Sequence, residues 1–342
     1  MRGVCITGLV LSLCAAAAVP DSGSSNTGIV SLVPFPARDH ATLRIAVAAL
    51  PGTPLELHCA IYPVEPGDAI WEKSWTAIGG PNNETTVVAR PSVLPQPWDL
   101  QHPALYTVNC SVINALTNTD SRHEPEAPQR RQHQPPDQPK SALAVRFGFR
   151  SFTTAGGRFL LNGRPIFLRG NSINPPGRDL PPVSGTKHFA LSYLRWMKEN
   201  AHVNAVRIGD GVSNTTALWY DAADEVGLLI YAGPYNNPAC PECRAKPADK
   251  PVPAGSVQKA VESYVKVLRG VAPHPSHVIL ILSNENDISG TRGHWGGSPF
   301  AYEYAGLLRN VTAALKQYDP SRVILADAGF GHGLGGEVMD DQ

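Results

Sequence analysis

Hydrophobic and polar positions alternate over short runs in the first half of the chain. Such runs occupy residues 42–47, 55–61 and 105–112, and turns rich in Pro and Gly separate them. A period of two is typical of half-buried β-strands, and short strands with frequent turns are typical of an antiparallel sandwich. Residues 29–150 are therefore predicted to form a small β-sandwich.

After Phe147 the pattern changes to nearly continuous apolar runs that alternate with amphipathic helical segments. The predicted strands are 165–169, 205–208, 228–231, 278–282 and 322–326. The predicted helices are 187–201 and three others that begin near Asn214, Ser256 and Ser298, with Ser256 expected as an N-cap and Gly227 as a left-handed helix end. This alternation predicts a parallel sheet over residues 151–342, either doubly wound or a (β/α)8 barrel.

The first predicted strand is followed by Arg169 to Asn174, which contains neither a GxGxxG motif nor a P-loop. A nucleotide cofactor is therefore disfavoured, no other cofactor is indicated, and the barrel is the preferred architecture.

The chain has 29 basic and 29 acidic side chains, so there is no general electrostatic attraction to nucleic acid or anionic lipid. Residues 118–141 are rich in Pro and polar side chains, which predicts a disordered, solvated insertion.

The amino terminus has the pattern of a secretory leader. Arg2 precedes an apolar run from Val4 to Ala18 that ends in four small residues. Residues 1–19 are therefore predicted to be a signal peptide, and the protein to be secreted and extracellular. A membrane anchor is the alternative, but this run is shorter than the roughly 18 to 20 residues that cross a bilayer, so no membrane association is expected.

Four cysteines follow the leader, together with four glycosylation acceptor sites at Asn83, Asn109, Asn214 and Asn310. Both features are typical of a secreted glycoprotein. Cys59 and Cys110 lie on two predicted strands with two tryptophans between them, an order resembling an immunoglobulin-like core, and either a disulfide or plain burial fits them. Cys240 and Cys243 favour a short disulfide loop or free thiols over a zinc site, because no second ligand pair has matching spacing.

Polar residues follow the predicted strands, where parallel folds place their sites. Glu285 comes directly after a buried strand, and a desolvated carboxyl group can stay protonated and act as a general acid. Asn284 could bond a sugar hydroxyl, Arg207 could orient a carboxylate, and Trp295 could stack on a sugar. Each has a structural alternative. Asn284 and Glu285 could simply begin a polar loop, Arg207 could form an internal ion pair, and Trp295 could pack within its own loop.

His274 and His277 have no metal-ligand spacing and are interpreted as structural, so no metal is expected.

Several sequence segments resemble those of one protein family, and they occur in the same order along the chain. They are residues 97–108, 145–150, 159–170, 197–207, 219–229 and 274–285. This series resembles glycoside hydrolase family 2, which includes β-galactosidases, β-glucuronidases and β-mannosidases. The resemblance implies an immunoglobulin-like β-sandwich followed by a partial (β/α)8 TIM barrel with about five of eight strands.

By this resemblance Glu285 is the acid/base of a retaining β-glycosidase acting on a carbohydrate substrate. Asn284 would hold the 2-hydroxyl, Arg207 would support the nucleophilic carboxylate, and Asn171 and Trp295 are further candidate sugar contacts. Residues 172–174 and 209–212 depart from the family's usual sequences there, so the sugar is not identified.

The family's nucleophile follows the seventh strand, whereas the last strand predicted in this chain is the fifth. The chain is therefore expected to be truncated at its C-terminus, to need a partner or a missing segment that completes the barrel, and to hydrolyse aryl β-glycosides negligibly alone. A noncatalytic carbohydrate-binding or scaffold protein is the alternative. An α/β oxidoreductase or transferase is disfavoured by the absent phosphate loop.

Overall fold

The computed structural model describes residues 28–78, 84–115, 141–173, 182–208, 214–233, 251–284 and 301–328. The predicted signal peptide, residues 118–140 of the predicted insertion and the pair Cys240 and Cys243 lie outside these ranges, whereas Ser141, the last residue assigned to the insertion, begins a strand. In the described part, every helix is too short or too polar to cross a membrane.

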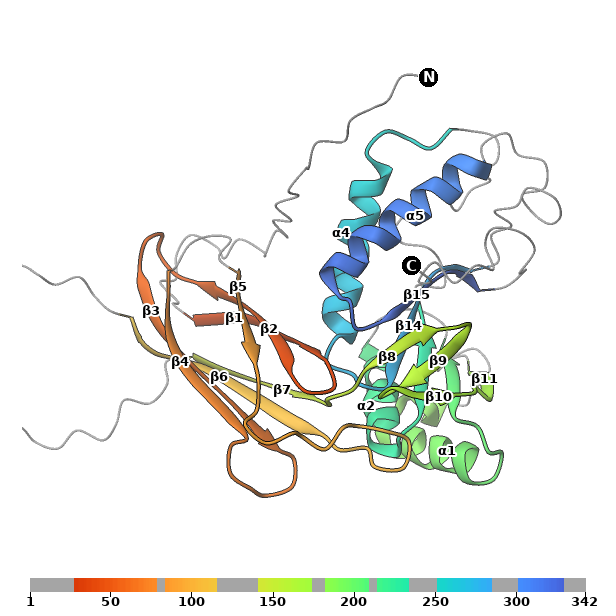
Figure 1. Cartoon of the computed structure of the whole chain (residues 1–342), viewed down its shortest axis with the longest axis horizontal. Coiled ribbons are helices and arrows are strands. Elements are labelled where there is room, and N and C mark those ends of the chain that lie inside the picture. The colour runs from red at the N-terminus through yellow and green to blue at the C-terminus, as the bar shows by residue number, and fades with distance from the viewer. Residues whose placement is uncertain are drawn as a thin grey trace, which may run out of the picture.

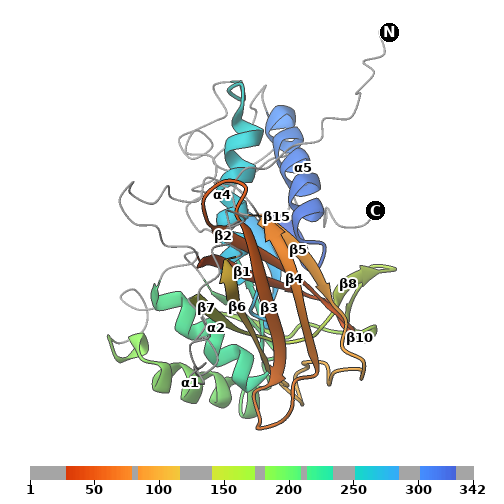
Figure 2. The ribbon, with the colours of Figure 1, turned by 90° about the vertical axis from the view of Figure 1, so that its left-hand side faces the viewer.

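The first unit consists of two antiparallel sheets that share one core, and we call it the sandwich (Figure 2). One sheet has the order β1-β2-β5, with β1 Gly28–Pro36, β2 Ala41–Ala48 and β5 Glu84–Ala89. The other has the order β4-β3-β6-β7, with β4 Trp71–Ile78, β3 Pro54–Pro63, β6 Tyr106–Ala115 and β7 Ser141–Phe147. The strands predicted at 42–47, 55–61 and 105–112 are confirmed, and their buried positions alternate as expected.

Cys59 and Cys110 form a disulfide, which decides the question that the sequence left open. They are direct cross-strand partners on β3 and β6, with their Cα atoms 4.1 Å apart. The immunoglobulin disulfide joins opposite sheets, whereas this one joins neighbours within a single sheet. Trp71 and Trp75 are half-buried on β4. The predicted analogy with an immunoglobulin core therefore does not extend to this cysteine pair.

A small sheet of three short strands links the sandwich to the second unit. It has the order β10-β9-β8, with β8 Phe152–Ala155, β9 Arg158–Leu161 and β10 Arg164–Ile166. Two-residue turns join them, Gly156-Gly157 and Asn162-Gly163, and all four residues have positive φ, as tight hairpin turns require. The prediction that 165–169 begins the parallel sheet is wrong, because Arg164–Ile166 pairs antiparallel with β9.

The second unit is a five-stranded parallel sheet in the order β11-β12-β13-β14-β15. Its strands are β11 Gly170–Ile173, β12 Ala205–Ile208, β13 Leu229–Ala232, β14 His277–Asn284 and β15 Val323–Ala328. The 3-10 helix η1 Pro182–Gly185 and the helices α1 Lys187–Glu199, α2 Asn214–Val226, α4 Ser256–Val271 and α5 Ala301–Tyr318 lie between them in the chain (Figure 1). Four of the five predicted parallel strands are thus confirmed, and the first lies a few residues later than expected.

Two cores cover the two faces of this sheet. One face packs against the helices through a large apolar cluster, and the other packs against the β8–β10 sheet. Gly227 ends α2 with a φ of 73°, as predicted. Ser256, in contrast, is not the N-cap: it is the first helical residue, and Gly255 with a φ of 79° precedes it without a side-chain cap.

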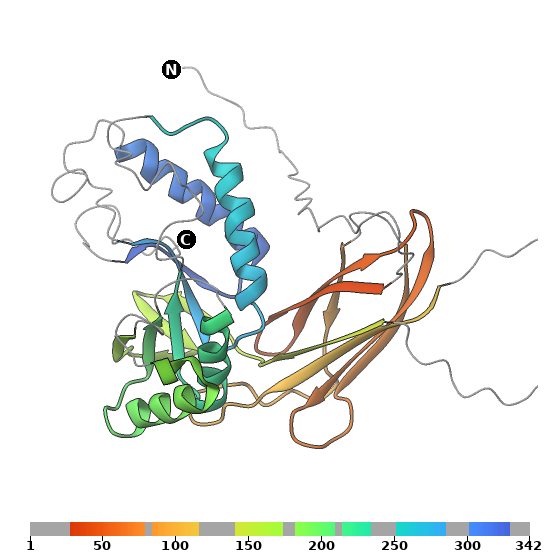
Figure 3. The ribbon, with the colours of Figure 1, turned by 180° about the vertical axis from the view of Figure 1, so that it is seen from behind.

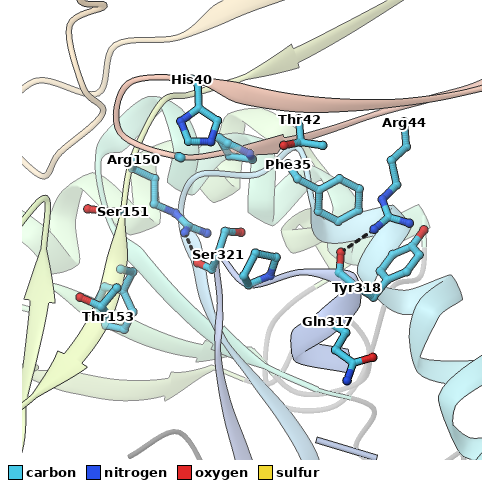
Figure 4. A pocket seen from close by; sticks show the side chains of 14 residues that line it. Phe35, His40, Thr42, Arg44, Arg150, Ser151, Thr153, Gln317, Tyr318 and Ser321 are labelled. Carbon is cyan, nitrogen blue, oxygen red and sulfur yellow. Dashed lines mark hydrogen bonds between the residues drawn. The ribbon is translucent and has the colours of Figure 1, made fainter. Parts of the chain in front are cut away.

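The sandwich packs against the helices through the outer face of β1-β2-β5, and Figure 3 shows α4 beside it. Phe35 meets the ring of Tyr318 edge-on at 5.5 Å. The Arg44 guanidinium lies 4.0 Å above that ring (Figure 4), and Glu84 pairs with both Arg44 and Arg269. The two units therefore share an interface of aromatic and charged side chains.

Candidate active site at the ends of the parallel strands

Strand register decides which side chains share a face of the parallel sheet. One row of paired residues, formed by Ile173, Ile208, Ala232 and Leu280, belongs to the core beneath the helices. The neighbouring row, formed by Ser172, Arg207, Tyr231 and Ile279, lies on the opposite face because side chains alternate along a strand. We call this second face the inner face.

Arg207 and Tyr231 are neighbours on the inner face, near the carboxyl ends of β12 and β13. Both are half-buried. Burial raises the pKa of the Tyr231 hydroxyl, and the positive charge of Arg207 opposes part of that rise. The pair therefore places a cation and a neutral phenol where a negatively charged group could be bound and oriented.

Small residues make room for the Tyr231 ring. A Cβ atom added to Gly170 would lie 2.8 Å from the Tyr231 hydroxyl oxygen, and Ala205 lies beside Gly170 in the next strand. Tyr231 therefore lies along the inner face from β13 towards β11. Sequence reasoning missed this residue, although a lone tyrosine in an aliphatic strand was a usable signal.

Asn171 does not join Arg207. It pairs with Val206, which belongs to the core beneath the helices, so Asn171 lies on the opposite face of the sheet from Arg207. Its side-chain oxygen accepts the backbone N–H of Ser172 at 2.8 Å. The structure thus separates two of the predicted substrate contacts, and Ser172 takes the position beside Arg207.

Asn284 is the last residue of β14, and its backbone lies beside Ala328 at the end of β15. Glu285 follows directly in the chain, and both Glu285 and Trp295 lie outside the described residues. β14 lies between β13 and β15 and is buried along its apolar part. Asn284 is therefore the last described residue at this carboxyl edge, and Glu285 is its neighbour in the sequence.

Gly233 marks an unusually close approach at this edge. A Cβ atom there would lie 1.8 Å from the carbonyl oxygen of Ile281. The end of β13 thus runs directly against β14, and only glycine fits. Sequence reasoning could not identify this contact, because it depends on the approach of two backbone segments.

A buried network occupies the opposite, amino-terminal end of the sheet. The Arg150 guanidinium donates to the backbone oxygens of Pro275 at 3.0 Å, His277 at 2.9 Å and Ser321 at 2.5 Å. Burial and then repulsion from Arg322 lower the pKa of Arg150 to about 9, which leaves it charged at neutral pH. This arginine fixes the linker after the sandwich to the starts of β14 and β15.

The histidines at this end are also engaged in structure, which agrees with their interpretation from sequence. His277 is buried, and its Nδ1 accepts a hydrogen bond from Nε of Arg322 at 3.3 Å. Nδ1 of His274 forms a hydrogen bond with the Asp224 carboxylate at 2.7 Å. The ligand atoms of Asp221, Asp224 and His274 lie within 4.8 Å of one another. Arg146 and a backbone N–H already bind these carboxylates, so the group serves the fold.

Known proteins that are similar to this chain in sequence carry the names of glycosidases. No family model matches the chain. Among curated proteins, a β-galactosidase from Enterobacter cloacae is 24% identical over 275 residues, which are 79% of this chain and 22% of that protein. A β-mannosidase from Bos taurus is 25% identical over 179 residues, or 50% of this chain and 19% of that protein.

Solved structures agree in fold. A β-glucuronidase from Parabacteroides merdae superposes with a TM-score of 0.60 at 18% identity, covering 87% of this chain and 34% of the other. A family 2 glycosyl hydrolase from Bacteroides cellulosilyticus gives 0.57 at 17% identity, covering 88% and 35%. The chain thus spans about a fifth of these curated relatives and about a third of these structures. In sequence motifs and in fold, it resembles glycoside hydrolase family 2 over that part of their length.

Proposed function

We propose that this chain carries the acid/base half of a retaining β-glycosidase site, on an immunoglobulin-like sandwich followed by five strands of a (β/α)8 barrel. The sequential strand order supports the barrel, because a doubly wound sheet reverses its strand order at a switch point. The single observation that carries the proposal is the position of Glu285, directly after Asn284 at the carboxyl edge of β14.

In this proposal Glu285 donates its proton to the glycosidic oxygen as the bond to the leaving group breaks. A second carboxylate attacks the sugar carbon and forms a glycosyl–enzyme intermediate. Glu285 then removes a proton from the water that releases the sugar. The second carboxylate comes from a segment beyond the five strands, on the same gene product or on a partner chain.

Other residues bind and orient in this scheme. Arg207 supports the second carboxylate from the inner face, where Tyr231 lies beside it. Asn284 bonds the sugar 2-hydroxyl and Trp295 stacks on the sugar ring. Asn171 is given no substrate contact in this scheme, because it shares the face of Val206. The substrate class is a β-galactoside, β-glucuronide or β-mannoside, as the names of the relatives indicate. The leader and glycosylation sites support a secreted enzyme.

The test compares this chain with the product of the complete transcript. We expect aryl β-galactosides, β-glucuronides and β-mannosides to be hydrolysed negligibly by this chain alone, and one of them to be hydrolysed with retention by an extended product. In that product Glu285→Gln lowers kcat by about 100-fold or more, because the general acid is lost. Glu262→Gln, on an exposed position of α4, is the matched control.

Two results would contradict this function. Turnover by the 342-residue chain that Glu285→Gln abolishes would show that the second carboxylate is already present. An extended product that binds sugars but hydrolyses none of the three substrates would favour the noncatalytic alternative.

A further inference from the structure

Two of the four glycosylation acceptor sequences lie on elements at positions whose side chains the structure describes. Asn109 is on β6 in the sequence Asn-Cys-Ser, and Asn310 is on α5 in the sequence Asn-Val-Thr. Both side chains are exposed. Among the described residues, neither amide takes part in a hydrogen bond. In this part of the chain, both amide groups are thus left for solvent, although both belong to regular secondary structure.

Small side chains lie beside both asparagines and leave space for a bulky substituent. Asn109 is paired in register with Ala60 on β3 and with Ala144 on β7. On α5, Gly306 lies one turn before Asn310, and residues four apart are neighbours on a helix surface. A Cβ atom added to Gly306 would meet no atom within 4 Å. An oligosaccharide on either amide would therefore extend into solvent without displacing a packed side chain.

The acceptor sequence is read by a transferase that uses a lipid-linked oligosaccharide in the secretory pathway. The amide nitrogen forms a bond to C1 of the first sugar and loses a proton, while the bond from C1 to the lipid diphosphate breaks and the diphosphate leaves. The transferase also has to reach the hydroxyl two positions after the asparagine. In the folded chain Thr312 is only 4% exposed, and β6 is paired on both sides. Transfer therefore has to occur before these two elements fold.

At Asn109 this order of events competes with the disulfide. Cys110 lies between Asn109 and Ser111, and its bond to Cys59 joins β6 to β3. A segment that a transferase binds has to be free of the sheet, whereas this bond holds the acceptor sequence against a neighbouring strand. Val311 occupies the middle position of the other acceptor sequence and cannot form such a bond. The two sites therefore differ in how long they remain open to modification.

We propose that both asparagines carry N-linked glycans, Asn310 in nearly every molecule and Asn109 only in molecules in which transfer precedes the disulfide. The glycan on Asn109 covers the outer face of the sheet β4-β3-β6-β7, because Cys110 next to it faces the core and side chains alternate along a strand. The glycan on Asn310 covers the solvent side of α5. The proposal rests on the predicted secretory leader and is independent of the glycosidase proposal.

Peptide mass spectrometry on the full chain, expressed in a eukaryotic cell line, tests both sites. An amidase that converts each glycosylated asparagine to aspartate, used in ¹⁸O-labelled water, marks the occupied sites. We expect nearly complete occupancy at Asn310 and a distinctly lower occupancy at Asn109. Asn310→Gln should remove one glycan from every molecule, which a gel-mobility shift also detects.

Cys59→Ala tests the competition, because it removes the disulfide and leaves the acceptor sequence at Asn109 intact. Occupancy at Asn109 should rise to the level of Asn310, both in this variant and in the natural sequence made during a pulse of membrane-permeant reductant. Cys240→Ser/Cys243→Ser is the matched control and should leave it unchanged. Occupancy is measured on newly made intracellular chain, so a variant that folds poorly still gives a result.

Three results would overturn the proposal. The first is an unglycosylated Asn310 in the natural sequence. The second is equal occupancy at the two sites in that sequence. The third is an occupancy at Asn109 that neither Cys59→Ala nor the reductant changes.

Discussion

Single residues set the distances on which this architecture depends. Sequence pattern predicted Asn284 and Glu285 as site residues because they follow a buried apolar strand, and the structure places Asn284 at the end of β14. The pattern did not identify Tyr231 or Gly233 as special, since their importance comes from a neighbouring strand. Gly170 leaves space for the Tyr231 ring, and Gly233 lets β13 reach the backbone of β14. Contacts between strands far apart in sequence are therefore what sequence reasoning lacked.

Gly233→Ala is expected to destabilise the parallel unit severely. The new Cβ would lie 1.8 Å from a backbone oxygen, and neither backbone can move without breaking the sheet. We expect a loss of about 3 kcal/mol or more in the free energy of unfolding, measured by urea denaturation. Gly306→Ala in α5, which has open space around it, should instead stabilise by up to about 1 kcal/mol. Equal effects of the two substitutions would contradict the close approach.

His277 is expected to make stability depend on pH. Burial, and then repulsion from Arg322, holds the pKa of His277 well below its usual range. The unfolded chain therefore takes up a proton near pH 6.5 that the folded chain does not, so stability falls as pH decreases below about 6.5. Thermal unfolding between pH 7.5 and 5 is the measurement, over roughly the range in which histidine titrates.

His277→Asn should reduce this slope by up to about 1.4 kcal/mol per pH unit, and His188→Gln, at an exposed position of α1, should not. An unchanged slope in His277→Asn would show that other groups cause the loss.

At the level of elements, short strands near the linker were the hardest to place. The run from Pro165 to Arg169 is apolar enough for a parallel strand, and its hydrophobic pattern alone predicted it as the first strand of the parallel sheet. Asn162-Gly163 is a strong hairpin signal just before it, and the structure uses that turn to pair β9 with β10. The longer elements, such as α4 and β14, were predicted well because their periodicity extends over more residues.

The disulfide between β3 and β6 is expected to contribute substantially to the sandwich. It closes a loop over a sequence separation of 51 residues, for which loop entropy predicts about 4 kcal/mol at most. The double variant Cys59→Ala/Cys110→Ala should unfold at lower denaturant concentration and lose most of its sensitivity to reducing agent. Cys240→Ser/Cys243→Ser should keep that sensitivity. If the first variant unfolds like the unmodified chain, the bond does not stabilise the sandwich.

At the scale of the whole molecule, the two units are joined by buried groups as well as by surface pairs. Arg146 pairs with Asp221 and Glu225 of α2, and Glu84 pairs with Arg269 of α4. Each of these pairs is partly exposed and contributes about 1 kcal/mol or less. Arg150 is fully buried and holds three carbonyls of the parallel unit, so it is the stronger link.

Arg150→Met is expected to uncouple the two units. It leaves three buried backbone oxygens without their donor, at a cost of about 1 to 3 kcal/mol each. Differential scanning calorimetry should then resolve two unfolding transitions, or a lower one for the parallel unit, where the unmodified chain shows one. Arg158→Met, at an exposed position of β9, is the control. A single transition at the original temperature in Arg150→Met would contradict the link.

The position of Arg150 also has a mechanical consequence. It comes three residues after β7 and donates to the backbone oxygen of His277, the first residue of β14. From His277 to Asn284 the strand extends about 23 Å. A rotation of the sandwich would pull on that strand at its base, and the strand would carry the displacement to the residue before Glu285. The orientation of the sandwich and the position of β14 are therefore linked through one guanidinium group.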